Sequence, residues 1–177
     1  KKNLDKIYYV RDINFFLKSL AIKKRNIFKG KVIGITGSAG KTTLKTTLSF
    51  FMKKKYNVSS SHKSYNNFLG VMLSILNMDS KSNFAIFELG TNNFGEISSL
   101  VQYVKPSITM ITNIQPTHLE NFKTKKNVAI EKSDIFNPKY NSNINSVILS
   151  NDTKEEKNLV KIAKEYKVKN IIKVGDT

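Results

Sequence analysis

Residues 34–43 read Gly-Ile-Thr-Gly-Ser-Ala-Gly-Lys-Thr-Thr, and this stretch decides the fold of the chain. The mostly apolar residues 31–33 before it predict a buried strand, and residues 44–54 after it predict a helix with one apolar face. A glycine-rich turn between a strand and a helix binds phosphate, because its N–H groups and the positive end of the helix dipole converge on an anion. In such a loop Lys41 reaches the β- and γ-phosphates, and the Thr42 hydroxyl binds Mg²⁺. The chain is therefore predicted to bind a nucleoside triphosphate.

The loop is a variant of the P-loop pattern. The strict pattern requires a glycine five residues before Gly40, where this chain has Ile35. The alternative is an ordinary strand-to-helix turn that contains Gly-Lys-Thr by chance. The strand before the loop and the helix after it favour nucleotide binding.

The composition is that of one globular domain. The chain has 177 residues, of which 40% are hydrophobic, and this length is sufficient to bury a core. No apolar run reaches the roughly 18 residues of a membrane span, and no signal-peptide core follows the N-terminus. Cysteine is absent, which excludes disulfides and thiolate metal sites. We expect a cytoplasmic protein that does not bind membranes.

A formal net charge of +17 raises the question of nucleic-acid binding. Only Arg11 and Arg25 are arginines, and the lysines are scattered along the chain, as at 53–55 and 123–126. We interpret this pattern as a solvated, lysine-rich surface, and we predict no nucleic-acid partner. A basic duplex-binding module is the alternative, and it would bind any duplex in a salt-sensitive way.

Strands and helices alternate along the rest of the chain. The predicted strands are residues 56–60, 84–87, 108–112, 146–149 and 170–174, and the predicted helices are residues 68–77, 95–104, 125–136 and 153–166. This alternation predicts βαβ units and an α/β fold with a mainly parallel β-sheet flanked by helices.

Residues 1–30 do not make a full domain. They predict a short strand at 7–10 and a helix at 12–24, which we interpret as the tail of a preceding domain and a linker helix. Residues 31–177 form the nucleotide-binding domain. We expect this domain to be incomplete at its C-terminal end, because the last predicted strand is followed by almost no sequence.

Three polar residues outside the glycine-rich loop are candidate site residues. Glu88 ends an apolar strand, where an acid in a P-loop protein often holds Mg²⁺, although a surface or helix-capping role is the common alternative. His118 follows another strand and by itself indicates only a loop histidine. Lys132 lies among apolar residues of a predicted helix, and the residues alone favour a lysine that extends to solvent.

Several motifs resemble segments of the Mur ligase family, in family order, over about residues 31–137. Residues 36–43 are similar to the family's nucleotide loop, which also lacks the first glycine. The Asn-Asn pair with the following glycine, at residues 66–70, is similar to a loop of the family. Residues 88–97 and 111–122 resemble segments typical of the D-alanyl-D-alanine-adding branch. Residues 129–136 resemble the family's helix with a carbamylated lysine.

The resemblance implies the P-loop-NTPase-like central domain of a ligase that uses ATP and Mg²⁺. It implies ATP-phosphate contacts from Thr36, Gly37, Ser38, Ala39, Gly40, Lys41, Thr42 and Thr43. It implies one Mg²⁺ on Thr42 and Glu88 and a second on His118 and carbamylated Lys132. The implied catalytic residues are Lys41, His118 and Lys132. The implied substrate-side loop consists of Asn66, Asn67 and Asn113.

The implied reaction belongs to peptidoglycan precursor synthesis. The carboxylate of a UDP-N-acetylmuramoyl-tripeptide is phosphorylated, and the amine of D-Ala-D-Ala attacks the acyl phosphate. Two cations would neutralise the phosphate and the carboxylate so that two anions can meet. The resemblance implies a monomer, and we expect this chain alone to be inactive as a ligase, because the substrate-binding domains of the family lie outside it.

The sequence departs from the family pattern at four positions. Lys63 and Ser64 replace the usual Gly and Asn, Phe94 replaces Pro, and Gln115 replaces a common Gly. One alternative is a related amide ligase of the folylpolyglutamate or cyanophycin type, which acceptor specificity would distinguish. The other is a P-loop module without ligation chemistry, although the Asn-Lys-x-Asp segment of a GTP-binding switch is absent from the sequence.

Overall fold

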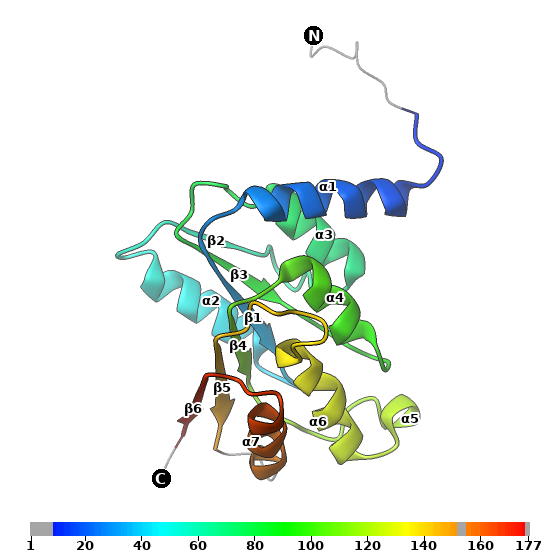
Figure 1. The fold of residues 1–177 in the computed structure, drawn as a ribbon, viewed down its shortest axis with the longest axis vertical. Helices are drawn as coiled ribbons and strands as arrows, with labels where there is room; N and C mark the ends of the chain where they lie inside the picture. The colour runs from blue at the N-terminus through cyan, green and yellow to red at the C-terminus, as the bar shows by residue number, and fades with distance from the viewer. Residues whose placement is uncertain (1–8, 152–154, 176–177) are drawn as a thin grey trace.

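A parallel β-sheet with helices on both faces forms the centre of the protein (Figure 1). The computed structural model describes residues 9–151 and 155–175. The described part contains a six-stranded sheet in the order β2-β3-β1-β4-β5-β6, and every neighbouring pair of strands is parallel. The predicted α/β fold with a mainly parallel sheet is confirmed.

The elements of the described residues alternate as predicted. The strands are β1 (Lys31–Thr36), β2 (Val58–Ser60), β3 (Phe84–Glu88), β4 (Ile108–Ile111), β5 (Ser146–Ser150) and β6 (Asn170–Val174). The helices are α1 (Ile13–Ile27), α2 (Lys41–Met52), α3 (Phe68–Asn77), α4 (Glu96–Val104), α5 (Leu119–Phe122), α6 (Lys125–Ser133), the 3₁₀ helix η1 (Asp134–Phe136) and α7 (Glu156–Glu165). Within the described ranges no helix is both long enough and apolar enough to cross a membrane.

Some element boundaries differ from the predictions for identifiable reasons. Helix α2 begins at Lys41 rather than at residue 44, because Gly40 adopts the left-handed conformation and is its N-cap. The predicted helix over 125–136 changes to a 3₁₀ turn after Ser133, whose hydroxyl donates to the Ile130 carbonyl at 2.6 Å.

Two further differences concern a short helix and the ends of the described ranges. Helix α5 was not predicted, since four residues are too few to show a helical period. Half of the strand predicted at 7–10 lies outside the described residues, and residues 9 and 10 form no strand. The first residues of the helix predicted at 153–166 also lie outside the described part.

The two faces of the sheet carry separate cores. On the face covered by α2, Ile33 and Ile35 of β1 pack against Leu44, Leu48 and Met52. Successive side chains of a strand point to opposite faces, so Val32, which precedes Ile33, belongs to the other core. That larger core contains side chains of α1, α3, α4, α6 and α7, including Ala21, Val71, Met72, Ile97, Val101, Val128, Ala129 and Leu159.

The order of the strands brings three chain segments to one edge of the sheet. Strand β1 lies between β3 and β4. The chain leaves the carboxyl end of β1 toward β2 through α2, and it leaves the carboxyl end of β3 in the opposite direction, toward β4, through α4. Ligands of open α/β sheets bind in the crevice at such a point. The residues that follow Thr36, Glu88 and Ile111 therefore lie close together at this edge.

Helix α1 packs on helices α3 and α4 rather than directly on the sheet (Figure 1). Its Arg25 donates from Nε to the Val104 carbonyl at 2.6 Å and from a terminal nitrogen to the Lys105 carbonyl at 2.8 Å. These are carbonyls at the C-terminal end of α4, where a cation also interacts favourably with the helix dipole. Residues 13–27 are thereby attached to the helical layer.

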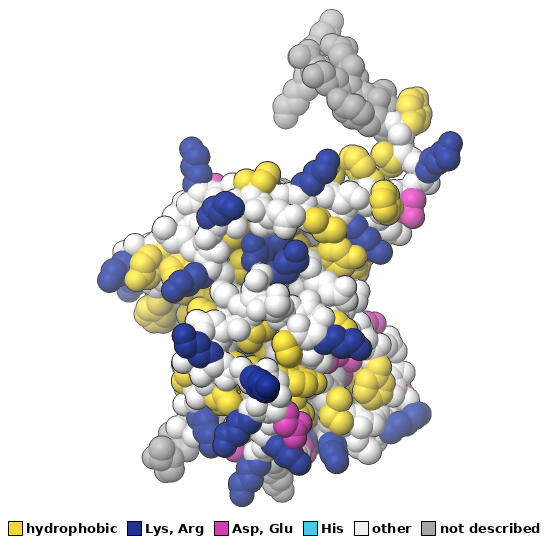
Figure 2. All heavy atoms as spheres, in the orientation of Figure 1, with side chains coloured by type: hydrophobic (Ala, Val, Ile, Leu, Met, Phe, Trp, Pro, Cys, Tyr) yellow, Lys and Arg dark blue, Asp and Glu magenta, His cyan; other side chains and the backbone are white. Residues whose placement is uncertain are grey.

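The charge of the surface is dispersed. Lysine and arginine side chains lie singly or in small groups over the face seen in Figure 2, with other residue types between them. This distribution agrees with the interpretation of the lysines as a solvated surface.

A carboxylate from α6 caps the beginning of α4. Helix α4 has Gly95 at its N-cap, which offers no side chain. Glu131, only 2% exposed, instead accepts hydrogen bonds from Gly95 N at 2.8 Å, Ile97 N at 2.9 Å and Thr91 Oγ1 at 3.2 Å. Burial raises the pKa of the Glu131 carboxyl, and the hydrogen bonds from the Ile97 and Gly95 N–H groups oppose this shift.

We expect Glu131→Ala to lower the free energy of unfolding by about 2–4 kcal/mol, because three donors, two of them in the buried residues Thr91 and Ile97, lose their acceptor. Urea unfolding at neutral pH measures this change. Glu165→Ala is the matched control, since that side chain is 58% exposed. A loss no larger than that of the control would contradict the capping role.

Candidate functional site

The glycine-rich loop connects β1 to α2, and two of its glycines are required for different reasons. Gly37 has φ +147°, and a Cβ there would lie 1.9 Å from Thr112 Oγ1. Gly40 has φ +78° and open space around it, so its backbone conformation rather than its packing requires glycine. The predicted strand–loop–helix unit is present, with the loop at the carboxyl edge of the sheet.

The polar groups of the loop are engaged by the chain itself. Lys41 Nζ donates to the carbonyls of Gly37 at 2.8 Å and Ser38 at 3.3 Å. The N–H of Ser38 donates to the Asn113 carbonyl at 3.0 Å, and the N–H of Ala39 donates to Asn113 Oδ1 at 3.0 Å. Asn113, expected on the substrate side, is therefore hydrogen-bonded to the nucleotide loop.

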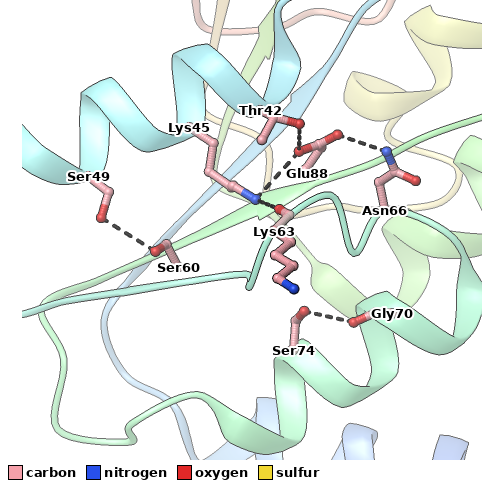
Figure 3. A network of polar contacts seen from close by, with 9 residues as sticks. All are labelled: Thr42, Lys45, Ser49, Ser60, Lys63, Asn66, Gly70, Ser74 and Glu88. Carbon is pink, nitrogen blue, oxygen red and sulfur yellow. Dashed lines mark hydrogen bonds and ion pairs between the residues drawn. The ribbon is translucent and has the colours of Figure 1, made fainter.

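Burial lowers the pKa of Lys41, and the nearby Glu88 carboxylate opposes that shift. This carboxylate ends β3 and is 1% exposed. Its Oε2 accepts from Thr42 Oγ1 at 2.8 Å, and its Oε1 accepts from Asn66 Nδ2 at 2.7 Å (Figure 3). The structure thus brings together Thr42 and Glu88, a hydroxyl and a carboxylate of the kind that binds Mg²⁺.

Lys45 also belongs to this site, although it is not among the residues predicted from the sequence. Its Nζ lies 3.5 Å from Glu88 Oε2, and its side chain is 3% exposed. Lys45 follows Lys41 by one turn of α2, so the two side chains lie on the same helix face. That spacing was the available signal, but it does not distinguish a buried lysine from an exposed one.

Lys132 is buried on α6 with 3% exposure, so the interpretation of a lysine that extends to solvent is wrong. Burial lowers the pKa of Lys132 to about 8, with a further lowering from Lys41 and an opposing effect of Glu131. The charge of Lys41 thus acts on Lys132, although the two lysines lie on different helices.

His118 is the N-cap of α5 and has a left-handed conformation with φ 54°. Its Nδ1 lies 3.7 Å from Glu120 Oε1, and its side chain is 42% exposed. In the described part of the chain, no three His, Cys, Asp or Glu side chains form a cluster that could hold a metal ion. The predicted ligand set includes only two such residues, Glu88 and His118, because its other members are Thr42 and Lys132.

A cavity of about 780 Å³ opens beside these residues. Its lining joins the nucleotide loop to the segments before α3, α4 and α5, and includes Lys41, Asn66, Asn67, Phe68, Thr91, Phe94, Glu96 and His118. Asn113 is not part of this lining. The cavity is large enough for part of a substrate, and Lys41 and His118 both face it.

The two asparagines of the cavity wall also have structural contacts. Asn67 caps α3, because its Oδ1 accepts from the Gly70 N–H at 2.9 Å. The Asn66 carbonyl accepts from the Gly90 N–H at 2.8 Å, and a Cβ on Gly90 would lie 2.8 Å from the Asn66 side chain. The wall is therefore held close to the residues that follow Glu88.

Known proteins with similar sequences include a ligase that is longer than this chain. The UDP-N-acetylmuramoyl-tripeptide--D-alanyl-D-alanine ligase of Rickettsia prowazekii (strain Madrid E) is 37% identical over 171 residues, which are 97% of this chain and 38% of that protein. This chain thus spans about 38% of the length of that relative.

Solved structures of MurF proteins are similar to this chain in fold. MurF from Acinetobacter baumannii superimposes with a TM-score of 0.83 at 27% identity, over 98% of this chain and 38% of that chain. MurF from Thermotoga maritima in complex with ADP gives a TM-score of 0.77 at 27% identity, over 98% of this chain and 39% of that chain. The sequence profile described as the Mur ligase middle domain matches residues 35–177. This chain therefore belongs to the Mur ligase family.

Proposed function

We propose that this chain is the ATP- and Mg²⁺-binding portion of an ATP-dependent ligase of peptidoglycan precursor synthesis. The proposed reaction joins D-Ala-D-Ala to a UDP-N-acetylmuramoyl-tripeptide, the activity named for the Rickettsia prowazekii relative. The observation that carries the proposal is the contact between Thr42 of the nucleotide loop and the buried carboxylate of Glu88, next to the cavity. We propose that ligation also needs the parts of the relative that this chain does not match.

We assign the ATP phosphates to the loop from Thr36 to Thr43. The Lys41 ammonium, now bonded to two loop carbonyls, would exchange these contacts for phosphate oxygens. Its burial supports this role, because a phosphate interacts more strongly with a partly desolvated cation than with a hydrated one. The ADP in the Thermotoga maritima structure supports the choice of an adenine nucleotide.

We assign one Mg²⁺ to Thr42 and Glu88 and a second to His118 and carbamylated Lys132. Bound Mg²⁺ would neutralise phosphate and carboxylate charge. The oxygen donors Thr42 and Glu88 suit this ion, since Mg²⁺ prefers hydroxyl and carboxylate ligands. Lys132 suits it only after modification, because an ammonium repels a cation.

Carbamylation of Lys132 forms one bond and releases one proton. The neutral amine attacks the carbon of CO₂, and the product is a carbamate with one negative charge. The lowered pKa of Lys132 supplies the neutral amine near pH 8. The new anion would also interact favourably with Lys41, whereas the ammonium is repelled by it.

The proposed ligation has two steps. A carboxylate oxygen of the tripeptide attacks the γ-phosphorus of ATP, and ADP leaves. The amine of D-Ala-D-Ala then attacks the acyl carbon, and inorganic phosphate leaves with formation of the amide. We propose that Asn66 and Asn67 contact the tripeptide side of the cavity.

We further propose that residues 1–30 are the tail of a preceding domain with a linker helix, and that residues 31–177 belong to the middle domain. The start of the family match at residue 35 supports this division. We also propose a monomeric, cytoplasmic protein, in agreement with a substrate that is a nucleotide-linked precursor.

We expect this chain to bind Mg-ATP, and Lys41→Ala to weaken binding by about 100-fold, because a charge-assisted contact to phosphate is lost. Isothermal titration calorimetry measures both affinities. Lys53→Ala, a change in an exposed lysine at the end of α2, is the control and should bind as the unchanged chain does. Equal affinities of all three proteins, or no binding by the unchanged chain, would contradict the assignment.

We expect ¹³C-labelled bicarbonate to give a carbamate resonance in the ¹³C NMR spectrum of the chain. At a fixed concentration of dissolved CO₂, the signal should increase as the pH rises through about 8, because only the neutral amine reacts. Lys132→Arg should lack the signal, and Lys126→Arg, an exposed lysine of the same helix, should retain it. A spectrum without the signal, or one unchanged by Lys132→Arg, would contradict carbamylation of this residue.

A further inference from the structure

Lys45 is a buried cation for which the proposed ligation has no role. It lies on α2, one turn after Lys41, and its side chain is 3% exposed. Its Nζ lies 3.5 Å from Glu88 Oε2 and donates a hydrogen bond to the Lys63 carbonyl (Figure 3). One side chain therefore contacts both a candidate metal ligand and the segment that leads to the cavity wall.

Glu88 needs a positive partner in the absence of metal. Its carboxylate is 1% exposed and accepts hydrogen bonds from the neutral groups of Thr42 and Asn66. Burial of a carboxylate without a paired cation is strongly unfavourable, because the charge loses its hydration. Among the described residues, Lys45 is the one that forms an ion pair with Glu88.

The second partner of Lys45 lies in an unfavourable backbone conformation. Lys63 has φ 44°, a left-handed value that favours glycine. The hydrogen bond from Lys45 to its carbonyl holds this turn against α2. Residues 61–67, which include Lys63 and Asn66, are in this way attached to the helix that follows the nucleotide loop.

We propose that Lys45 is a positioning residue that takes the place of the divalent cation at Glu88 when the site is empty and keeps residues 61–67 against α2. In this role its ammonium competes with Mg²⁺ for Glu88 Oε2. The competition rests on the proposed function, in which Thr42 and Glu88 hold Mg²⁺. The pairing in the empty site does not depend on it.

The pairing is tested by a double-variant cycle in thermal unfolding. Lys45→Met should lower Tm by about 5 °C or more, because Glu88 is left buried and unpaired. Adding Glu88→Gln to Lys45→Met should recover at least about half of that loss, since the uncompensated charge is then gone. Lys53→Met is the control for a lysine-to-methionine change, and the pairing would be refuted if the double variant were no more stable than Lys45→Met.

The attachment of residues 61–67 is tested by hydrogen exchange. Both Lys45→Met and the double variant lack the donor to the Lys63 carbonyl, so the hydrogen-bonded amides of this segment, those of Ser61 and Tyr65, should exchange at least about tenfold faster in both. Lys45→Arg, which keeps a cationic donor, should restore most of the protection. Unchanged exchange in the two methionine variants would refute this part of the proposal.

The competition with Mg²⁺ is tested by calorimetric titration with ATP, once in EDTA and once in excess Mg²⁺. The dissociation constant in EDTA divided by that in Mg²⁺ should increase by about tenfold in Lys45→Met. Removal of a nearby positive charge favours Mg²⁺ at Glu88 and therefore strengthens the binding of ATP with Mg²⁺. The ratio should stay within about twofold in Lys45→Arg and Lys53→Met, since both retain the cation at position 45. A merely structural lysine would lower both affinities equally and leave the ratio unchanged, which would refute the competition.

The same titration separates this proposal from the proposed function. If the unchanged chain binds ATP equally well in EDTA and in Mg²⁺, the assignment of Mg²⁺ to Thr42 and Glu88 fails, and the competition fails with it. The thermal cycle and the hydrogen exchange are measured without metal or nucleotide. They decide the pairing with Glu88 and the attachment of residues 61–67 in either case.

Discussion

The carboxylate of Glu88 is buried at the carboxyl edge of the sheet, and the surrounding elements supply the partners that such a charge requires. Parallel pairing places Glu88 beside Ile35 of β1, next to the start of the nucleotide loop. Helix α2 then contributes a hydroxyl and an ammonium, and the segment before α3 contributes an amide. Because desolvation of an unpaired carboxylate is costly, these three segments are constrained relative to one another before any ligand binds.

The nucleotide loop is subject to a related constraint. Asn113 accepts hydrogen bonds from the N–H groups of Ser38 and Ala39, and Lys41 donates to carbonyls of the loop. A phosphate would have to replace some of these contacts. The net affinity would then reflect the difference between the contacts to phosphate and the internal contacts that are lost.

The parts of this site that could be predicted from the sequence are those fixed by topology. The apolar patterns of a strand and a helix enclose the loop with Lys41 and Thr42, and Glu88 ends another apolar strand. A parallel sheet brings the carboxyl ends of its strands to one edge. The roles of Lys45 and Glu131 could not be predicted, because their partners are distant in the sequence and a lysine or glutamate on a helix usually faces water.

The positions of Lys132 and Asn113 could be predicted only in part. The apolar neighbours of Lys132 agree with its burial, but the sequence could not exclude an extended side chain that reaches solvent. Asn113 was placed correctly after a strand, whereas its contact with Ala39 depends on the path of a loop without a repeating pattern. The predicted roles of both residues in ligand binding remain predictions.

The distribution of positive charge favours a small anionic ligand over a nucleic acid. Lys45 and Lys132 are buried and Lys41 is half-buried, all near the carboxyl edge of the sheet. A duplex backbone contacts exposed cations along an extended surface, and the exposed lysines seen in Figure 2 are dispersed. A phosphate group can enter a cavity and reach the half-buried Lys41, where low polarity strengthens the interaction. The overall charge of +17 adds a general attraction for anions, whereas Lys41 beside the cavity is the cation that a phosphate can reach.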